Sequence, residues 1–309
     1  MIEAMTRIPL GIRHWPAWFG LGLLRLLLLL PYPVLVALGR VTGRLVYPLA
    51  WRWRLYTHLN LKRCFPELSY HERHRLARRH FEAVGVGLFE IGLGWWARAR
   101  RLRKWVSVEG LEHLHAARAD GRGVILMSAH FTSLEIGGRL LGLHTPFDLM
   151  YKENRSPVLE WVMGRNRRRH FDGVIRSDQV REMLRSLRRG RVVWYAPDLG
   201  YVRANSATVS FFGAPAPTNT ATPRVARAGN ARVLPFYPER LPGARGYRLR
   251  ILPALEDFPG EDPVADTERT NRILEDQIRR APEQYFWSHD RFKTKLHKRW
   301  PSLRRWLRG

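Results

Sequence analysis

"GVILMSAHFTSLEIGGRLL", residues 123–141, carries the pattern that decides the fold. The apolar run at 123–129 predicts a buried strand, and the spacing of apolar residues after Leu134 predicts an amphipathic helix. His130 then falls at the carboxyl end of the strand, and Glu135 falls in the first turn of the helix. Parallel α/β folds bind their ligands at the carboxyl ends of the strands. The stretch therefore predicts a strand–turn–helix unit with two ionisable side chains at a candidate site.

The rest of the 309-residue chain continues this alternation and is long enough for a packed core. Apolar or alternating runs predict further strands at 192–198, 233–238 and 247–255. Amphipathic stretches predict helices near 134–143, 158–169, 179–188 and from 263 onward. Because strands and helices alternate, we expect an α/β fold with a mainly parallel sheet flanked by helices.

The N-terminal part of the chain is hydrophobic enough to predict a membrane-anchor helix. "WPAWFGLGLLRLLLLLPYPVLVAL", residues 15–38, has Arg25 as its one charge and is long enough to cross a hydrocarbon core of about 30 Å. Two prolines in this run leave a kinked or re-entrant segment open, and a buried core helix is the alternative. Arginines are more numerous after the run than before it, which favours a cytoplasmic body. We expect an anchor within 1–50 and a cytoplasm-facing domain over 51–309.

The charge of the chain predicts a polyanionic partner. It has 53 basic and 27 acidic residues, a net charge of +26, and a pI of about 11.4. Phosphorylated lipid head groups, an acidic protein and nucleic acid all fit this charge. The 12 Trp suit a membrane interface or base stacking, but no pattern of a nucleic-acid-binding module is visible, so nucleic-acid binding is a distant alternative. The single cysteine, Cys64, excludes an intrachain disulfide and favours a reducing location.

The residues alone leave two interpretations of His130 and Glu135 open. Five positions along an α-helix turn the side chain by ~140° net, so the two side chains meet only if His130 precedes the helix. Thr132 or Ser133 can then be the N-cap. In one interpretation the two residues are a catalytic pair. In the other, Glu135 is a capping-box residue that accepts from a backbone N–H, and His130 is an ordinary histidine at a strand end.

Blocks spread along the chain decide between these interpretations, because they resemble the late (secondary) lipid A acyltransferases. The resemblance covers nearly all of residues 15–295 and is closest to the Kdo-dependent lipid IVA lauroyltransferase branch. The blocks are "LLPYPV" (29–34), "NLKRCFPELS" (60–69), "AHFTSLEIGGR" (129–139), "GRVVWYAPD" (190–198) and "PEQYFWSHDRFK" (282–293). One departure is Asp290, where that branch tends to have a basic residue.

The resemblance implies a glycerol-phosphate-acyltransferase-like fold and an O-acyltransferase of lipopolysaccharide lipid A biosynthesis. The implied reaction moves a fatty acyl chain, lauroyl or similar, from acyl-acyl carrier protein to a hydroxyacyl group of a Kdo-lipid A precursor. His130 is implied to be the general base, and Glu135 the carboxylate that orients and stabilises its imidazole. Arg167, with Arg165 as runner-up, is implied to stabilise the oxyanion or bind a phosphate. Asp198 is implied to orient that arginine or contact the acceptor.

The same resemblance implies partners and a location. The partners are acyl carrier protein as co-substrate, a lipid A precursor glycolipid and the membrane, with no nucleic acid, no cofactor and no metal. The location is the bacterial inner membrane, with the catalytic domain on its cytoplasmic side. A lysophospholipid or another glycolipid is the alternative acceptor. The basic tail at 295–309 predicts an interfacial helix, with a frayed terminus as its alternative.

Overall fold

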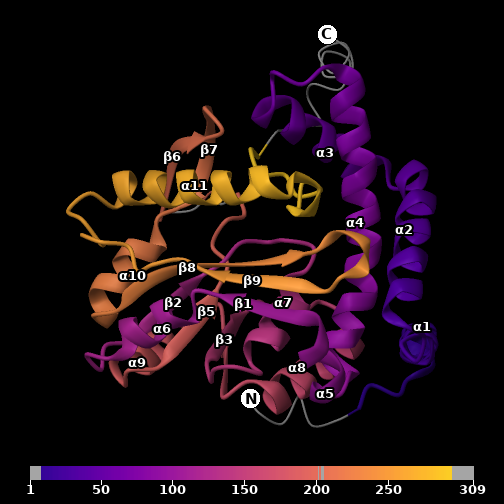
Figure 1. Cartoon of the computed structure of the whole chain (residues 1–309), viewed down its shortest axis with the longest axis horizontal. Helices are drawn as coiled ribbons and strands as arrows, with labels where there is room; N and C mark the ends of the chain where they lie inside the picture. The colour runs from indigo at the N-terminus through magenta and orange to yellow at the C-terminus, as the bar shows by residue number, and fades with distance from the viewer. Residues whose placement is uncertain (1–7, 201, 203–204, 294–309) are drawn as a thin grey trace.

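The computed structural model describes residues 8–200, 202 and 205–293 (Figure 1). Its strands are β1 (Val106–Glu109), β2 (Val124–Met127), β3 (Asp148–Tyr151), β4 (Gly173–Arg176), β5 (Val192–Tyr195), β6 (Ser206–Phe211), β7 (Ala214–Asn219), β8 (Arg232–Arg240) and β9 (Tyr247–Ile251). Seven of them form one sheet in the order β1-β9-β8-β2-β5-β3-β4, and β6 and β7 form a separate hairpin. Strands β8, β2, β5, β3 and β4 are parallel, and β9 pairs with β8 in antiparallel. The expected mainly parallel α/β fold is confirmed.

Helices flank this sheet. The α-helices are α1 (Trp15–Leu27), α2 (Tyr32–Leu49), α3 (Trp51–Cys64), α4 (Tyr70–Trp96), α5 (Ala99–Leu102), α6 (Leu111–Arg118), α7 (Leu134–Leu141), α8 (Pro157–His170), α9 (Val180–Arg188), α10 (Ala221–Gly229) and α11 (Pro263–Arg280). Short 3-10 helices are η2 (Ile12–His14), η3 (Arg103–Trp105), η4 (Pro242–Ala244) and η5 (Pro282–Gln284). Figure 1 shows α2 and α4 side by side at one edge, with α9 and α10 at the opposite end. The helices expected near 134–143, 158–169 and 179–188 are α7, α8 and α9.

Strand β2 lies at the centre of the sheet and is buried on both faces. Val124 and Leu126 belong to the core cluster that contains buried residues of α4 and α7. Ile125 and Met127 belong to a second cluster with α9 and α10. A central parallel strand has no polar face, and this is why its sequence is a continuous apolar run.

The hydrophobic run at 15–38 forms two helices where one was expected. Residues 28–31 separate α1 from α2, and Pro31 is the N-cap of α2. Proline has no backbone N–H to continue a helix, and the Arg101 guanidinium donates to two carbonyl oxygens of this break at 2.6 and 2.7 Å. Among the described residues, no helix has both the length and the apolar composition needed to cross a membrane. The single anchor helix is therefore not confirmed.

Helix α2 packs on α4 at distances that require glycine. A Cβ added to Gly39 would lie 2.5 Å from the Cα of Val86, and one added to Gly43 would lie 2.1 Å from the carbonyl oxygen of Phe81. A Cβ on Gly85 would lie 2.1 Å from the carbonyl oxygen of Gly39. Buried residues of α2 also belong to the same core cluster as β2. The division at residue 50 stays a prediction, while α2 shares its core with the chain that follows.

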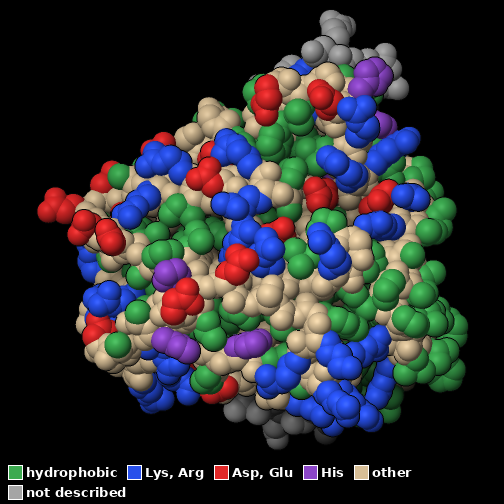
Figure 2. Space-filling model, viewed as in Figure 1, with side chains coloured by type: hydrophobic (Ala, Val, Ile, Leu, Met, Phe, Trp, Pro, Cys, Tyr) green, Lys and Arg blue, Asp and Glu red, His purple; other side chains and the backbone are tan. Residues whose placement is uncertain are grey.

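The N-terminal helices expose an apolar surface. Large apolar side chains exposed on α1, α2 and the start of α3 are Trp15, Phe19, Leu23, Leu26, Val34, Val41, Leu45, Leu49, Trp51 and Trp53. Figure 2 shows hydrophobic side chains along the edge where α1 and α2 lie in Figure 1. Extended apolar patches mark interaction surfaces. The interfacial helix predicted at 295–309 lies outside the described residues.

Candidate active site

The candidate site lies at the carboxyl ends of β2 and β5, which are neighbours in the sheet. The pairing register sets Met127 opposite Tyr195. His130 and Asp198 each follow three residues later, so the two loops bring them together. The Nδ1 atom of His130 lies 2.6 Å from Oδ1 of Asp198, and the His130 backbone N–H donates to both carboxylate oxygens at 3.1 Å. A histidine–carboxylate pair therefore stands where parallel sheets bind ligands.

The electrostatics of Asp198 decide the tautomer of His130. Burial by itself raises the pKa of Asp198, but the charge and hydrogen bonds of His130, with a hydrogen bond from Tyr285, outweigh it and leave this pKa below its usual value. An ionised carboxylate can only accept hydrogen bonds, so Nδ1 of His130 is the donor. The Nε2 atom of neutral His130 is then an acceptor. Since about a third of this side chain is exposed (32%), it is accessible to a substrate hydroxyl.

Glu135 lies in the first turn of α7 and binds an arginine. Its Oε1 accepts from Trp95 Nε1 at 3.0 Å and from Arg167 Nε at 3.2 Å, and its Oε2 accepts from Arg167 Nη2 at 2.6 Å. Ser133 is the N-cap of α7, but its hydroxyl donates to the carbonyl of Pro238 instead of capping the helix. The capping-box interpretation is therefore wrong for this helix.

The two carboxylates make different contacts from those that the resemblance implied. Glu135 was expected to hold the His130 imidazole, and the structure gives that contact to Asp198. Asp198 was expected to orient the arginine or contact the acceptor, and the arginine is bound by Glu135. The reason is geometric. The register of β2 and β5 brings Asp198 to His130, whereas the first turn of α7 directs Glu135 toward α4 and α8.

Of the two candidate arginines, Arg167 is the one that contacts Glu135. Arg167 is 8% exposed, and its Nη1 is buried without a hydrogen-bond partner among the described residues. Its guanidinium also lies 5.0 Å from the ring centroid of Tyr151. Arg165 is exposed and lies over the Trp161 ring instead, at 5.5 Å. The Nη1 donor of Arg167 is thus left without a partner among the described residues.

The segment around η5 holds the loop that carries His130. The Thr132 N–H donates to the Gln284 carbonyl at 2.8 Å, and the Phe286 N–H donates to the His130 carbonyl at 2.9 Å. The Gln284 side chain in turn binds both the N–H and the carbonyl of Arg240, each at 2.8 Å. The block at 282–293 carries part of the family resemblance, but its sequence does not predict these contacts. No local signal predicts a contact between positions so far apart in the chain.

His289 is a second histidine near the pair that sequence reasoning did not select. Burial and then the charge of Lys293 lower the pKa of His289 to about 4, with smaller effects from Asp198 and His130. Its Nε2 is buried without a hydrogen-bond partner in the described part of the chain. Its carbonyl accepts from Asn60 Nδ2 at 2.7 Å. His289 is therefore a neutral imidazole whose electrostatics are coupled to the His130–Asp198 pair.

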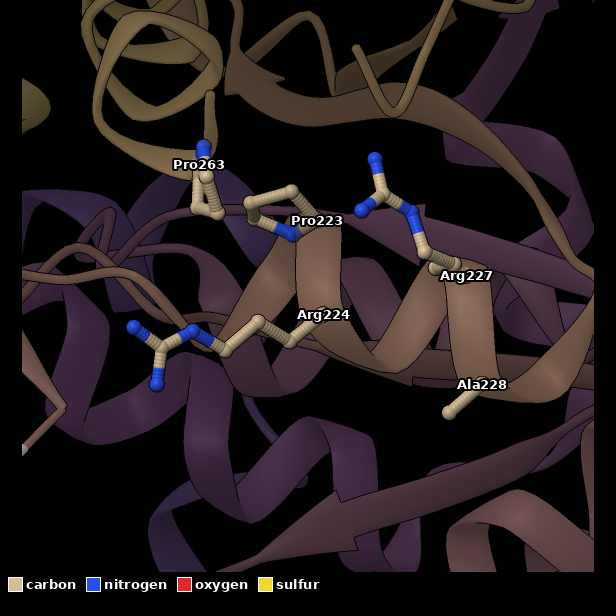
Figure 3. A pocket seen from close by; sticks show the side chains of 5 residues that line it. All are labelled: Pro223, Arg224, Arg227, Ala228 and Pro263. Atoms are coloured by element: carbon tan, nitrogen blue, oxygen red, sulfur yellow. The ribbon is translucent and has the colours of Figure 1, made fainter. Parts of the chain in front are cut away.

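A small cavity borders the site, and a larger one lies elsewhere. One of about 20 Å³ borders Asp198 and Ser128, with room for about one water molecule. Another of about 220 Å³ lies between α10 and the start of α11, where Figure 3 shows Arg224 and Arg227 beside Pro223 and Pro263. This larger cavity contains none of the predicted site residues. Within the described residues, no group of three or more His, Cys, Asp or Glu is arranged to hold a metal ion.

Comparisons with known proteins support the resemblance along almost the whole chain. The family described as bacterial lipid A biosynthesis acyltransferase matches residues 7–294. The chain is 38% identical to the lipid A biosynthesis lauroyltransferase of Escherichia coli (strain K12), over 94% of this chain and 97% of that protein. It is 39% identical to the palmitoleoyltransferase of the same organism, over 92% of each chain. It is 27% identical to that organism's lipid A biosynthesis myristoyltransferase, over 92% of this chain and 88% of that protein. The resemblance stated from the sequence is confirmed.

Proposed function

The chain belongs to the family of bacterial lipid A biosynthesis acyltransferases, and from this premise we propose the donor, the acceptor and the base of its reaction. The protein is an acyltransferase of late lipid A assembly. We propose that it moves a fatty acyl chain, lauroyl or similar, from acyl-acyl carrier protein to a hydroxyacyl group of a Kdo-lipid A precursor. The observation that carries the proposal is the 2.6 Å contact between His130 and Asp198.

His130 is the general base of the proposed reaction. Its Nε2 takes the proton of the acceptor hydroxyl while the hydroxyl oxygen attacks the thioester carbonyl. The tetrahedral intermediate then collapses, the ester forms, the carbon–sulfur bond breaks, and the proton on His130 passes to the leaving thiolate. Asp198 holds the tautomer and stabilises the imidazolium between these steps. No covalent bond to the enzyme is required.

Arg167 and Glu135 form the second part of the proposed machinery. The unpartnered Nη1 of Arg167 is a charged donor for the oxyanion of the tetrahedral intermediate. Glu135 holds the other side of the guanidinium through two hydrogen bonds, so that Nη1 is fixed before substrate arrives. Glu135 is therefore proposed to position Arg167, and His130 receives its carboxylate from Asp198.

The proposed partners follow from charge and apolar surface. The net charge of +26 favours an acidic carrier protein as donor and an anionic leaflet as the working surface. We propose that the protein works at the cytoplasmic face of the bacterial inner membrane. The exposed apolar residues of α1 and α2 support this, since they would be buried in lipid. The family membership leaves no support for the nucleic-acid alternative.

An acylation assay tests this function. Membranes that carry the wild type or His130→Gln would receive lauroyl-acyl carrier protein and a radiolabelled Kdo-lipid A precursor, with lysophosphatidic acid as a competing acceptor. Wild type should add one acyl chain to the precursor, and His130→Gln should be slower by a factor of about 10²–10⁴. Equal rates for the two proteins would refute His130 as the base. Acylation of lysophosphatidic acid alone would refute the acceptor and establish the alternative.

A further inference from the structure

Three arginines gather near the C-terminal ends of α7 and α8. Arg139 lies one turn after Glu135 on α7, Arg169 lies in the last turn of α8, and Arg103 begins η3. Among the described residues, the side chains of these three arginines make no hydrogen bond and no ion pair. We call Arg103, Arg139 and Arg169 the arginine cluster.

Contacts between the helices bring together the segments that carry Arg139 and Arg169. The Nε2 of His170, at the end of α8, lies 3.0 Å from the carbonyl oxygen of Trp95 at the end of α4. A Cβ added to Gly142, the C-cap of α7, would lie 3.4 Å from the His170 carbonyl oxygen. The ends of α4, α7 and α8 therefore meet. Burial lowers the pKa of Arg139, and the charges of Arg169 and Arg103 lower it further.

Arg139 is the member that demands an explanation. It is 9% exposed, and its Nε is buried with no hydrogen-bond partner in the described part of the chain. A guanidinium has five N–H donors, and a buried one is stable only when an acceptor or an anion faces it. Two further cations beside it add repulsion. A bound anion would satisfy the donors and offset the repulsion of all three charges.

The cluster lies next to the apolar surface of the N-terminal helices. Arg101, two residues before Arg103, binds the break between α1 and α2. Trp18 of α1 contacts Trp161 of α8 edge to face, with ring centroids 5.7 Å apart. Figure 2 shows Lys and Arg side chains gathered at the lower end of the hydrophobic edge, where α5 and α8 lie in Figure 1. If the apolar surface of α1 is buried in a leaflet, an anion bound to the arginine cluster lies close to the lipid phosphates.

We propose that the arginine cluster binds a phosphate monoester of the lipid acceptor and so positions the acceptor beside His130. The inference rests on the proposed function and adds to it a site for the charged part of the acceptor. Guanidinium groups match phosphate oxygens by paired hydrogen bonds. The cluster is about 6 Å along α7 from Glu135, since four residues of helix rise by 1.5 Å each. A phosphate bound there lies one turn from the Glu135–Arg167 pair.

Kinetics with matched acceptors test the assignment. Arg139→Gln should raise the KM for the phosphorylated acceptor by about tenfold to a hundredfold, with the KM for acyl-acyl carrier protein unchanged. Arg169→Gln and Arg103→Gln, whose side chains are exposed, should raise it less and still fold. Arg272→Gln on α11 is the control, with a side chain 64% exposed. On an acceptor stripped of its phosphates, wild type and cluster variants should have equal KM values. A variant effect of the same size on the stripped acceptor would overturn the proposal.

Two further experiments distinguish the acceptor's phosphate from bulk lipid head groups, and neither requires enzymatic activity. Inorganic phosphate should raise the unfolding temperature of wild type, and should raise that of Arg139→Gln much less. Flotation with phosphatidylglycerol vesicles should be the same for both proteins. A loss of flotation in Arg139→Gln with an unchanged acceptor KM would assign the cluster to bulk lipid head groups and overturn the acceptor assignment.

The proposed function and this inference can fail separately. Wild type could fail to acylate the lipid A precursor while phosphate still raises its unfolding temperature more than that of Arg139→Gln. That result would refute the proposed acceptor and support the anion site. If wild type acylates the precursor and neither phosphate nor the cluster variants change anything, the reaction stands. The arginine cluster is then a solvated basic surface.

Discussion

Asp198 Oδ1 lies 2.6 Å from His130 Nδ1, although the two residues are 68 positions apart and belong to different loops. They meet because β2 and β5 pair with Met127 opposite Tyr195, and each residue follows its strand by three positions. Glu135, five positions from His130, binds Arg167 instead. The register of the two strands thus determines which carboxylate contacts His130, and proximity in sequence does not.

Asp198→Asn should reduce kcat by a factor of about 10²–10⁴ and leave the fold intact. An amide can donate to Nδ1, which would turn the imidazole to the tautomer that no longer accepts a proton at Nε2. Steady-state kinetics with the Kdo-lipid A precursor would measure the effect. Asp276→Asn, on an exposed position of α11 (78%), is the matched control. A kcat within twofold of wild type would show that Asp198 does not orient the base.

Glu135→Gln should also slow the reaction, but with a different pH signature. Removing the Asp198 charge disfavours the protonated imidazolium, so the acidic limb of kcat in Asp198→Asn should move to lower pH. Glu135 is neutralised by Arg167, and its replacement should leave that limb in place. A shift of the acidic limb of kcat in Glu135→Gln, with no shift in Asp198→Asn, would support the His130–Glu135 pair that the resemblance implied.

The coupling of Glu135 to Arg167 should appear in a double-mutant cycle. If the two act as a unit, Glu135→Ala with Arg167→Ala should lose little more activity than the worse single variant. A matched cycle of Arg167→Ala with Asp198→Ala should be closer to additive, because the structure shows no hydrogen bond between those two side chains among its described contacts. Additive losses in the Glu135–Arg167 cycle would contradict the proposed positioning role.

The sequence predicts those features that depend on local pattern. Continuous apolar runs mark the central strands because a buried parallel strand has no polar face, and β2, β5 and β8 lie where such runs stand. Pro31 interrupts the hydrophobic run, and the helix breaks there. The resemblance supplied the site residues, and the structure brings His130 and Asp198 into contact as one pair and Glu135 and Arg167 as another.

Contacts between elements that are far apart in the chain cannot be predicted from the local sequence pattern. Which carboxylate meets His130 depends on the register of two strands, and which arginine turns inward depends on how α8 packs. The support of the His130 loop by Gln284 and Phe286 joins positions about 150 residues apart. The Arg139 Nε and His289 Nε2 atoms have no hydrogen-bond partner among the described residues because they are buried. Burial depends on how the whole chain packs.

Gln284→Ala should destabilise the protein by about 2 kcal/mol or more, since it leaves the backbone N–H and carbonyl of Arg240 without partners in the core. Denaturant unfolding in detergent would measure the change. The neighbouring Glu283→Ala removes a side chain that is not fully buried and serves as control. The Gln284 carbonyl that accepts from the Thr132 N–H remains in Gln284→Ala, so activity should fall only as far as the loss of the side chain displaces η5. Unchanged stability would mean that water replaces both hydrogen bonds.

His80 should make the protein sensitive to mild acid. Burial lowers the pKa of His80 to about 4, and its ring is held between the Glu283 carbonyl at 3.1 Å and the Ser288 hydroxyl at 2.9 Å. The unfolded chain takes up the proton near pH 6.5 and the folded chain only near pH 4. Protonation of His80 therefore costs the folded state nothing above pH 6.5. About 3 kcal/mol of the free energy of unfolding is lost as the pH falls from 6.5 to 4. His80→Gln should reduce the slope of the unfolding free energy over this window, where His58 and His289 also contribute because their pKa values are lowered to about 4. His115→Gln, at an exposed position of α6, should leave the slope unchanged. Identical slopes for wild type and His80→Gln would refute the assignment.

Gly85→Ala should separate α2 from α4 and so test whether the N-terminal helices depend on this contact. The added Cβ would lie 2.1 Å from the Gly39 carbonyl oxygen and 2.6 Å from the Gly43 nitrogen, which are backbone atoms that cannot turn aside. Overpacking of this kind costs about 1–3 kcal/mol. Gly22→Ala on α1 is the matched control, because nothing outside the adjacent backbone of its own helix lies within 4 Å of its added Cβ. Limited proteolysis between α2 and α3 should accelerate in Gly85→Ala and not in Gly22→Ala. Equal rates would show that α2 is held by other contacts than its glycine face.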